Sequence, residues 1–474
     1  MEVLKYIYDW VNDMESEQNI LWVHGLAGSG KSTLSTTIAN TYSDSGQLGA
    51  FVFFSRDDTE RSGPTTFVRT LAHQIGSFNQ RIGAAIRAVL ESNSNILMYP
   101  LPRQFQRLVL DPLLEVGAPF PRIVIVLDAL DECGTADERE ILLTVLSQDF
   151  ANLPSTIRTI VTSCAENDIH IAFDSQHHIR PYQLDITSTG NAVDILTYFR
   201  HRMAFIRTKN RHLRLGTDWP GEEIFLQLVQ RASGLFVWAS TAVEFINGHA
   251  PKRRLDSILK GDASSGAEAA LDTLYMTALD SAGLWDDEDF VAEFRSILGI
   301  ILTARQPLSS SALDALLDLP EDRPSIHTIS LLRCVLQHHP NVRVLHPSFA
   351  DFLMNKDRCN RDIWHFDPSV YHRILAFRCL DRMDAVLRRN MCNMTLTVDG
   401  AIESLPEDVS YSCMFWVDHV CIIDDDVRPV VDRLHGFLFR HLIHWFEAMS
   451  ILHRVRDTIP LLEILIDWLL VSIL

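Results

Sequence analysis

The stretch GLAGSGKST, from Gly25 to Thr33, decides the fold of this chain. It directly follows the apolar run 20–23 and directly precedes a run, 34–42, that is typical of a helix. A strand, a glycine-rich turn and a helix in this order are the setting that a phosphate-binding loop requires. A Gly/Ser-rich turn that matches the pattern by chance is the alternative, and the flanking strand and helix disfavour it.

Each residue type in this loop has a defined task in holding a nucleotide. Gly25 and Gly30 let the backbone curl so that successive N–H groups point to one place. Lys31 brings a positive charge to the β- and γ-phosphates, and the Ser32 hydroxyl is a candidate ligand for Mg²⁺. The helix that begins here adds the positive end of its dipole. The remaining contacts to the nucleotide are expected from Gly28, Ser29 and Thr33.

Length and composition indicate a folded, multidomain protein. The chain has 474 residues, which is too long for one core and favours two to four domains. With 47% hydrophobic and 22% charged residues, its composition is ordinary for a folded chain. The net charge of −19 argues against binding to nucleic acid or to an acidic membrane surface.

The cysteines and the two ends favour a cytoplasmic protein. None of the 8 cysteines forms a C-x-x-C pair, so we expect buried free thiols and no zinc ribbon. The first residues lead into an amphipathic helix over 1–18 without a signal peptide. The tail 461–474 is apolar but short, and it carries Glu463 and Asp467, so it predicts a packing helix and no membrane span.

A second strong signal is the run RIVIVLD at 122–128, which reads as a strand buried on both faces. Its last residue, Asp128, would lie beside the phosphate loop and hold Mg²⁺. Asp131 and Glu132 follow, and they are candidates to orient a water near the γ-phosphate. An acidic loop that caps the next helix, 138–147, is the alternative.

The rest of the first part alternates strands with helices, which predicts a doubly wound parallel α/β sheet. Thr162 and Ser163 end one strand where a sensor of the γ-phosphate would lie. Arg56 follows another strand, either as a phosphate contact or as a surface ion pair. The further strands expected are 49–55, 156–163 and 179–184, and the helices expected between them are 64–76, 80–92 and 103–114.

Beyond 191 the sequence is almost entirely helical. Two short extended pieces, 334–336 and 342–345, follow helices and predict the hairpin of a winged helix. The last part is helical with Trp416, Trp445 and Trp468 as core anchors. We therefore predict four domains: a P-loop nucleotide-binding domain at 1–186, a helical domain at 187–262, a winged helix at 263–357 and a helical domain at 358–474.

Taken together, these motifs resemble the NACHT class of STAND NTPases in the form found in fungal NOD-like receptors, with a nephrocystin-type P-loop domain. The D-x-x-D-E spacing of Asp128, Asp131 and Glu132 is typical of NACHT proteins. The resemblance rests on ILWVHGLAGSGKST, FVFFSR, IVIVLDALDECG, IRTIVTS, GLFVWASTAVEFI, PLSSSAL, LHPSFADFL, RRNMCNM and YSCMFWVDH.

The resemblance implies a nucleotide-operated switch in innate immunity or self/non-self recognition. Such proteins are closed with ADP, open and oligomerise on exchange for ATP, and reset by hydrolysis. Asp131 and Glu132 would then be the catalytic acids. His346 is similar to the winged-helix histidine that touches the ADP β-phosphate, and its alternative is a satisfied core histidine. Gly234-Leu235-Phe236 stands where relatives carry a Gly-Leu-Pro adenine contact, but here the proline is missing.

Two departures from the family pattern matter. Relatives read Thr-Ser-Arg after the fourth strand, whereas this chain reads Thr162-Ser163-Cys164 and lacks that fixed positive charge. The chain also begins close to the phosphate loop and ends before any sensor repeats, so we expect a core switch, either a truncated gene model or a short paralogue. A degenerate scaffold that does not cycle nucleotide and an ordinary metabolic P-loop enzyme are the competing hypotheses. Effector or sensor partners, the activating ligand, the oligomer size and the preferred base are left open.

Overall fold

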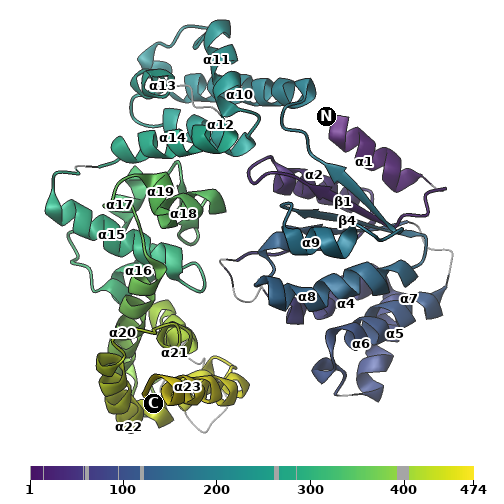
Figure 1. The fold of residues 1–474 in the computed structure, drawn as a ribbon, viewed down its shortest axis with the longest axis vertical. Coiled ribbons are helices and arrows are strands. Elements are labelled where there is room, and N and C mark those ends of the chain that lie inside the picture. Colours follow the sequence, from purple (N-terminus) through teal and green to yellow (C-terminus); the bar gives the residue numbers. More distant parts are fainter. Residues whose placement is uncertain are drawn as a thin grey trace. The chain divides into compact units, whose positions relative to one another are not determined.

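The computed structural model describes residues 2–473 apart from 14, 57, 59–62, 94, 118–121, 261–265, 284 and 392–404 (Figure 1). The chain packs as two units. One consists of Met1–Val243 with Asp262–Leu271, and the other of Glu244–Gly261 with Asp272–Leu474. The four domain ranges expected from the sequence stay a prediction.

The first unit is built on one parallel sheet, as the sequence predicts. Its strands are β1 (Ile20–His24), β2 (Leu48–Phe53), β3 (Ile123–Asp128), β4 (Ile157–Ser163) and β5 (Ile179–Gln183). They are ordered β2-β3-β4-β1-β5 and every neighbouring pair is parallel. The carboxyl ends of β3, β4 and β1 therefore lie side by side, and β4 separates the other two.

Helices cover both faces of this sheet (Figure 1). Alternate strand residues such as Leu21 and Val126 pack with α1 (Glu2–Asn12) and α2 (Lys31–Asp44). Trp22 and Ile125 face the opposite way, into the larger core. The helices of this unit that follow α2 are α4 (Phe67–Phe78), α5 (Gln80–Ser92), α6 (Leu101–Phe105), α7 (Asp111–Val116), α8 (Ala136–Thr144), α9 (Asn167–Phe173), α10 (Thr189–Lys209), α11 (Glu222–Ala232) and α12 (Phe236–Ile246), the last of which ends in the second unit. The fold is thus a doubly wound P-loop NTPase domain followed by helices.

The first helix is shorter than expected: the prediction of a helix over 1–18 is wrong beyond Asn12. The following loop is held in a non-helical path by Arg158 of β4, whose side chain is 1% exposed. Its guanidinium donates to the carbonyl oxygens of Asp13, Ser16 and Gln18 at 2.9, 3.1 and 2.9 Å. A contact with a residue more than a hundred positions away thus outweighs the local helical pattern.

The second unit is helical with one short hairpin. The expected extended pieces pair as antiparallel β6 (Leu336–Gln337) and β7 (Arg343–Val344). The winged helix as a domain type stays a prediction. The helices are α13 (Pro251–Lys260), α14 (Ala267–Asp280, which begins in the first unit), α15 (Glu288–Thr303), α16 (Ser310–Leu317), α17 (Ile326–Leu331), α18 (Pro347–Met354), α19 (Lys356–Cys359), α20 (Pro368–Val386), α21 (Glu407–Val420), α22 (Arg428–Ile451) and α23 (Thr458–Ile473).

Tryptophans anchor the last helices, as the sequence predicts. Trp416 and Trp445 are fully buried with their rings edge to face, and Trp468 of α23 donates its Nε1 proton to the Ile423 carbonyl at 2.9 Å. The apolar tail therefore packs as a helix on α21 and α22. Among the described residues, no helix combines the length and the apolar character that crossing a membrane requires.

A buried polar chain links α20 and α21 in this unit. The Arg305 N–H donates to the Tyr411 hydroxyl at 3.0 Å, and that hydroxyl lies 2.8 Å from His419 Nε2. His419 Nδ1 lies 2.9 Å from His372 Nδ1. With the Tyr411 proton directed at Nε2, the hydrogen bonds run from Tyr411 to His419 and from the His419 Nδ1 proton to His372. Both imidazoles must be neutral in this arrangement.

Candidate functional site

The phosphate loop connects β1 to α2 with two glycines in left-handed conformations. Gly28 and Gly30 have φ of 75° and 97°, values that residues with a side chain rarely adopt. A Cβ on Gly30 would also lie 3.3 Å from the Phe236 ring. The turn therefore requires glycine at these positions, which the sequence pattern predicts for Gly30; the second positive φ belongs to Gly28 and not to the expected Gly25.

Lys31 is held inside this loop and is only 8% exposed. Its ammonium group donates to the carbonyl oxygens of Gly25 at 2.8 Å and Leu26 at 2.9 Å, and lies 3.6 Å from Cys164 Sγ. Two main-chain carbonyls and a thiol carry no full negative charge. The charge of Lys31 is therefore not cancelled by a carboxylate among these partners, which suits a group that binds phosphate.

Asp128 ends β3 at the same edge of the sheet and is 1% exposed. Its Oδ1 accepts from the hydroxyls of Ser35 at 2.9 Å and Thr162 at 2.5 Å. Since both hydroxyls bond Oδ1, neither occupies Oδ2, and that oxygen is the one offered to a cation. Mg²⁺ is commonly held by one or two carboxylates together with phosphate oxygens and waters, so Asp128 fits the role expected for it.

The other residues expected at the site have mixed surroundings. Ser32 and Thr33 are exposed in the first turn of α2, whereas Ser29 is 7% exposed. It is Ser35, one turn further along, whose hydroxyl reaches Asp128. Sequence reasoning missed Ser35, although it follows Lys31 by one helical turn and so shares a face with it.

Asp131 and Glu132 lie in a short 3₁₀ turn, Leu130–Glu132, and both are half-buried. The Asp131 Oδ1 accepts from the Cys164 N–H at 2.9 Å, and the Glu132 Oε2 accepts from the Arg56 N–H at 3.4 Å. The structure thus brings Asp131 to the end of β4, beside the residue that contacts Lys31. The alternative of a helix cap does not describe Asp131 and Glu132, since α8 is capped by Thr135 and Glu138.

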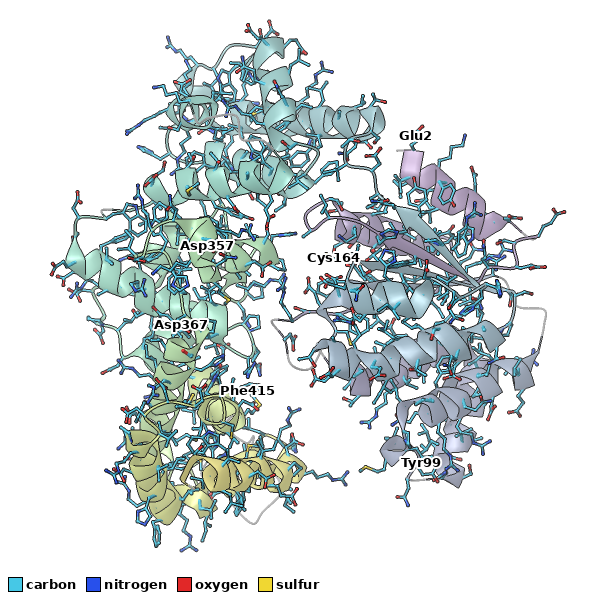
Figure 2. The ribbon with its side chains drawn as sticks, in the orientation of Figure 1. Glu2, Tyr99, Cys164, Asp357, Asp367 and Phe415 are labelled. Atoms are coloured by element: carbon cyan, nitrogen blue, oxygen red, sulfur yellow. The ribbon has the colours of Figure 1, made fainter. Side chains whose placement is uncertain are left out.

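Cys164 lies at the end of β4, where Figure 2 labels it beside the sheet. Burial and, to a smaller extent, the nearby Asp131 carboxylate raise the pKa of its thiol to about 12, against an opposing effect of Lys31. The thiol is therefore protonated and neutral at physiological pH. It supplies neither the positive charge of the arginine that the family pattern expects here nor a reactive thiolate.

His24 lies at the end of β1 and is a second neutral group beneath the loop. Its ring stacks on Trp22 at 4.3 Å and meets His170 of α9 at 5.4 Å. Burial, His170 and Lys31 lower the pKa of His24. The imidazole is therefore uncharged, and it leaves Lys31 as the cation of the loop.

The turn 234–237 contacts the phosphate loop directly. The Val237 N–H donates to the Gly28 carbonyl at 3.1 Å, and Phe236 lies against Gly30. Asn191 Nδ2 braces this turn by donating to the Gly234 and Ile186 carbonyls, each at 2.9 Å. Phe236 thus lies next to the loop, at the position where the family pattern expects proline.

His346 belongs to the second unit, and its role as a nucleotide contact stays a prediction. His346 caps α18: its Nδ1 accepts from the Ser348 N–H at 3.2 Å and also lies 2.7 Å from the Ser348 hydroxyl. A neutral His346 that accepts at Nδ1 carries its proton on Nε2. The capping bond thus orients the ring.

Comparisons with known proteins agree with the motifs. Residues 5–164 match the family described as Nephrocystin 3, N-terminal. Over 94% of its length the chain is 22% identical to the vegetative incompatibility protein HET-E-1 of Podospora anserina, and it covers 34% of that protein, about a third of its length. A STAND protein with a tetratricopeptide repeat sensor from Pyrococcus horikoshii superposes with a TM-score of 0.43 at 13% identity, with 98% of this chain and 57% of that one covered. The resemblance predicted from the motifs is thereby confirmed: residues 5–164 are similar to the nephrocystin 3 N-terminal family, and most of the chain is similar to the fungal protein HET-E-1.

Proposed function

We propose that this protein is a nucleotide-operated signalling switch of the STAND/NACHT class, closed with ADP and opened by ATP. The observation that carries the proposal is the phosphate loop after β1, with Lys31 buried inside it. Asp128 lies at the same edge of the sheet, at the end of β3, which is separated from β1 only by β4. A nucleotide phosphate bound at the loop would meet the N–H groups of the turn, the Lys31 ammonium and the start of α2.

Mg²⁺ is the cofactor that completes this proposal. Asp128 would hold it through Oδ2, and the Ser32 hydroxyl is the second ligand expected from the motif. The metal would neutralise phosphate charge when bound. The part that the chain itself plays is to keep the Asp128 carboxylate oriented through Ser35 and Thr162.

A direct link to the helices gives the switch a means of response. Nucleotide that alters the loop at Gly28 or Gly30 would also move Val237 and Phe236, which begin α12. Opening and homo-oligomer formation would follow from such movements, as would contact with effector or sensor proteins. The relative is a vegetative incompatibility protein, and we extend to this chain a role in fungal self/non-self recognition or innate immunity.

The proposal places the protein in the cytoplasm. The cysteines in the described residues are free, namely Cys133, Cys164, Cys334, Cys359, Cys379, Cys413 and Cys421. Free thiols are the usual state in a reducing compartment. Cys392 lies outside the described residues.

The experiment that tests the proposal is to denature the purified protein and chromatograph the released small molecules. We expect ADP in near-stoichiometric amount, because a closed switch retains its nucleotide. A site that is empty after purification and that binds no ADP at millimolar concentration would rule the switch out. It would favour the second candidate, a scaffold that keeps the fold but does not cycle nucleotide.

Hydrolysis is expected to be slow because Cys164 is neutral where relatives carry an arginine. Cys164→Arg should therefore raise phosphate release by about 100-fold, since one donor aimed at developing charge is worth about 10²–10³ in rate. Phosphate release is measured under single turnover, with Cys164→Lys as a variant that adds a charge without the planar fork. An unchanged rate in Cys164→Arg would show that Cys164 is not what limits hydrolysis.

A further inference from the structure

Arg139 of α8 joins three elements of the site through one buried guanidinium, and its residue is 5% exposed. Its Nη1 donates to the carbonyl oxygens of Asp131 at 2.8 Å, Cys133 at 3.3 Å and Gly134 at 3.4 Å. Its Nε and Nη2 both lie 2.8 Å from Asp168 Oδ2 on α9. The side chain thus binds the main chain of the acidic turn on one edge and a carboxylate on the other.

Asp131 is held by two separate hydrogen bonds, one to its main-chain carbonyl and one to its side-chain carboxylate. The Asp131 carbonyl is bound by Arg139, and its Oδ1 accepts from the Cys164 N–H at 2.9 Å. Cys164 in turn contacts Lys31 through its thiol at 3.6 Å. The distance from the Asp131 carboxylate to the phosphate loop is therefore set by two anchors, one on β4 and one on α8.

The stability of α8 does not by itself account for this arrangement. The helix begins with a capping box, in which Thr135 accepts from the Glu138 N–H and Glu138 accepts from the Thr135 N–H. Its first turn is thus satisfied without Arg139. Arg139 instead reaches backward over the turn that precedes the helix, which is where the two candidate acids lie.

The same guanidinium connects the acidic turn to the strand that carries the phosphate loop. Asp168 starts α9, and His170 and Phe173 of that helix pack edge-on against Trp22 of β1 at 4.9 and 5.3 Å. Trp22 also donates to the Ser163 hydroxyl of β4 at 2.8 Å. The acids, α9 and β1 therefore form one packed group.

We propose that Arg139 is a positioning residue, which together with Asp168 sets Asp131 and Glu132 relative to the phosphate loop. The inference rests on the nucleotide switch proposed above. Arg139 does not touch the nucleotide in this proposal. Its loss should weaken the step that depends on the acids and Mg²⁺ while leaving the binding of the phosphates to the loop in place.

The test compares Arg139→Lys with Arg158→Lys in the full chain. Arg158 is a matched control, because it is also buried and also donates to three main-chain carbonyls, but at the opposite end of β4. Lysine keeps the positive charge in both cases, but its single ammonium group cannot replace the several hydrogen bonds that the guanidinium makes through different nitrogens. The measurements are the Kd for ADP by calorimetry, Mg²⁺-dependent phosphate release from ATP under single turnover, and Tm.

We expect Arg139→Lys to keep the ADP Kd within about threefold of the wild type and to lower phosphate release by about 10–100-fold, as is usual for residues that orient a site from behind. Arg158→Lys should lower Tm without changing phosphate release. Equal loss of release in both variants at a similar drop in Tm would overturn the proposal, since it would show general loosening of the sheet.

A wild type that binds ATP but does not release phosphate calls for a second measurement. The quantity compared is then the Mg²⁺ concentration at which the affinity for ATP reaches half of its maximum. Arg139→Lys should raise this concentration, whereas Arg158→Lys should leave it unchanged. An unchanged value in Arg139→Lys would overturn the positioning role. If the wild type binds neither ADP nor ATP, the switch itself is refuted, and the failure is not one of Arg139.

Discussion

Lys31→Ala should abolish nucleotide retention, with the affinity for ADP lowered by at least about 100-fold. A hydrogen bond to a charged group contributes about 1.5–3 kcal/mol, and in the proposed complex one ammonium would serve more than one phosphate oxygen. The substitution also leaves the Gly25 and Leu26 carbonyls without the donor that bonds them now. Both effects act on the turn that cradles the phosphates.

The measurement is calorimetry with ADP and Mg²⁺, together with chromatography of nucleotide released from the purified variant. Lys31→Met is a second variant, which keeps an apolar stem of similar length in the loop and so separates loss of charge from loss of packing. Lys5→Ala removes an equal charge from an exposed position on α1 and should bind like the wild type. Undiminished ADP affinity in both Lys31 variants would refute the site.

Mild acid should destabilise the second unit, because its core holds the neutral pair His372 and His419. Burial lowers the pKa of His372 from 6.5 to about 4, and burial and His372 hold the pKa of His419 well below its usual value. A histidine whose pKa is lower in the folded state binds protons preferentially when unfolded. The stability it confers is therefore complete above pH 6.5 and is lost as the pH falls from 6.5 towards 4.

Among the described residues, no carboxylate is hydrogen-bonded to His372 or His419, so none offsets the added positive charge. Arg305 opposes protonation of both histidines, and the pKa of Asp418 is raised by burial. Tyr411 and Cys379, which also lie in this core, have raised pKa values and are neutral. The loss should approach about 1.4 kcal/mol for each pH unit and each histidine in this window.

This prediction is checked by urea unfolding at pH 7.0, 6.0 and 5.0, followed by the fluorescence of the buried tryptophans of α21 and α22. His372→Phe with His419→Phe removes the titrating groups and should give a shallower decline in the free energy of unfolding over this range. The Tyr411 hydroxyl loses its acceptor in that variant, so the slope with pH is compared and not the absolute stability. Equal slopes in the two proteins would contradict the assignment to these histidines.

Much of the geometry of the candidate nucleotide site could be predicted from the sequence because its signals are local. The strand, the glycine turn and the helix around Lys31 are consecutive, and the motif in this short stretch predicts a special backbone conformation at Gly30 but not at Gly28. The buried run ending in Asp128 marks a central parallel strand by its lack of alternation. In each case the residues that together determine the local structure are neighbours in the sequence.

The parts that could not be predicted are contacts between distant residues. The early end of α1 depends on Arg158. The orientation of Asp128 depends on Ser35 and Thr162. The position of the acidic turn depends on Arg139 and Asp168. No sequence pattern around Arg158 in its strand or Arg139 in its helix indicates that each side chain donates to three main-chain carbonyls. The same holds for His419, which reads as an ordinary helical residue until α20 places His372 beside it.

The sequence by itself determined that this chain has a phosphate loop, a doubly wound sheet and a neutral residue, Cys164, in place of an arginine. Only the tertiary structure decided which side chains hold the Asp128 carboxylate, and that the turn at Phe236 lies on the loop. The physical reason is that a loop conformation is selected by the steric limits of its own residues. The direction in which a buried polar group points is selected by whatever donors and acceptors the fold brings within about 3 Å of it.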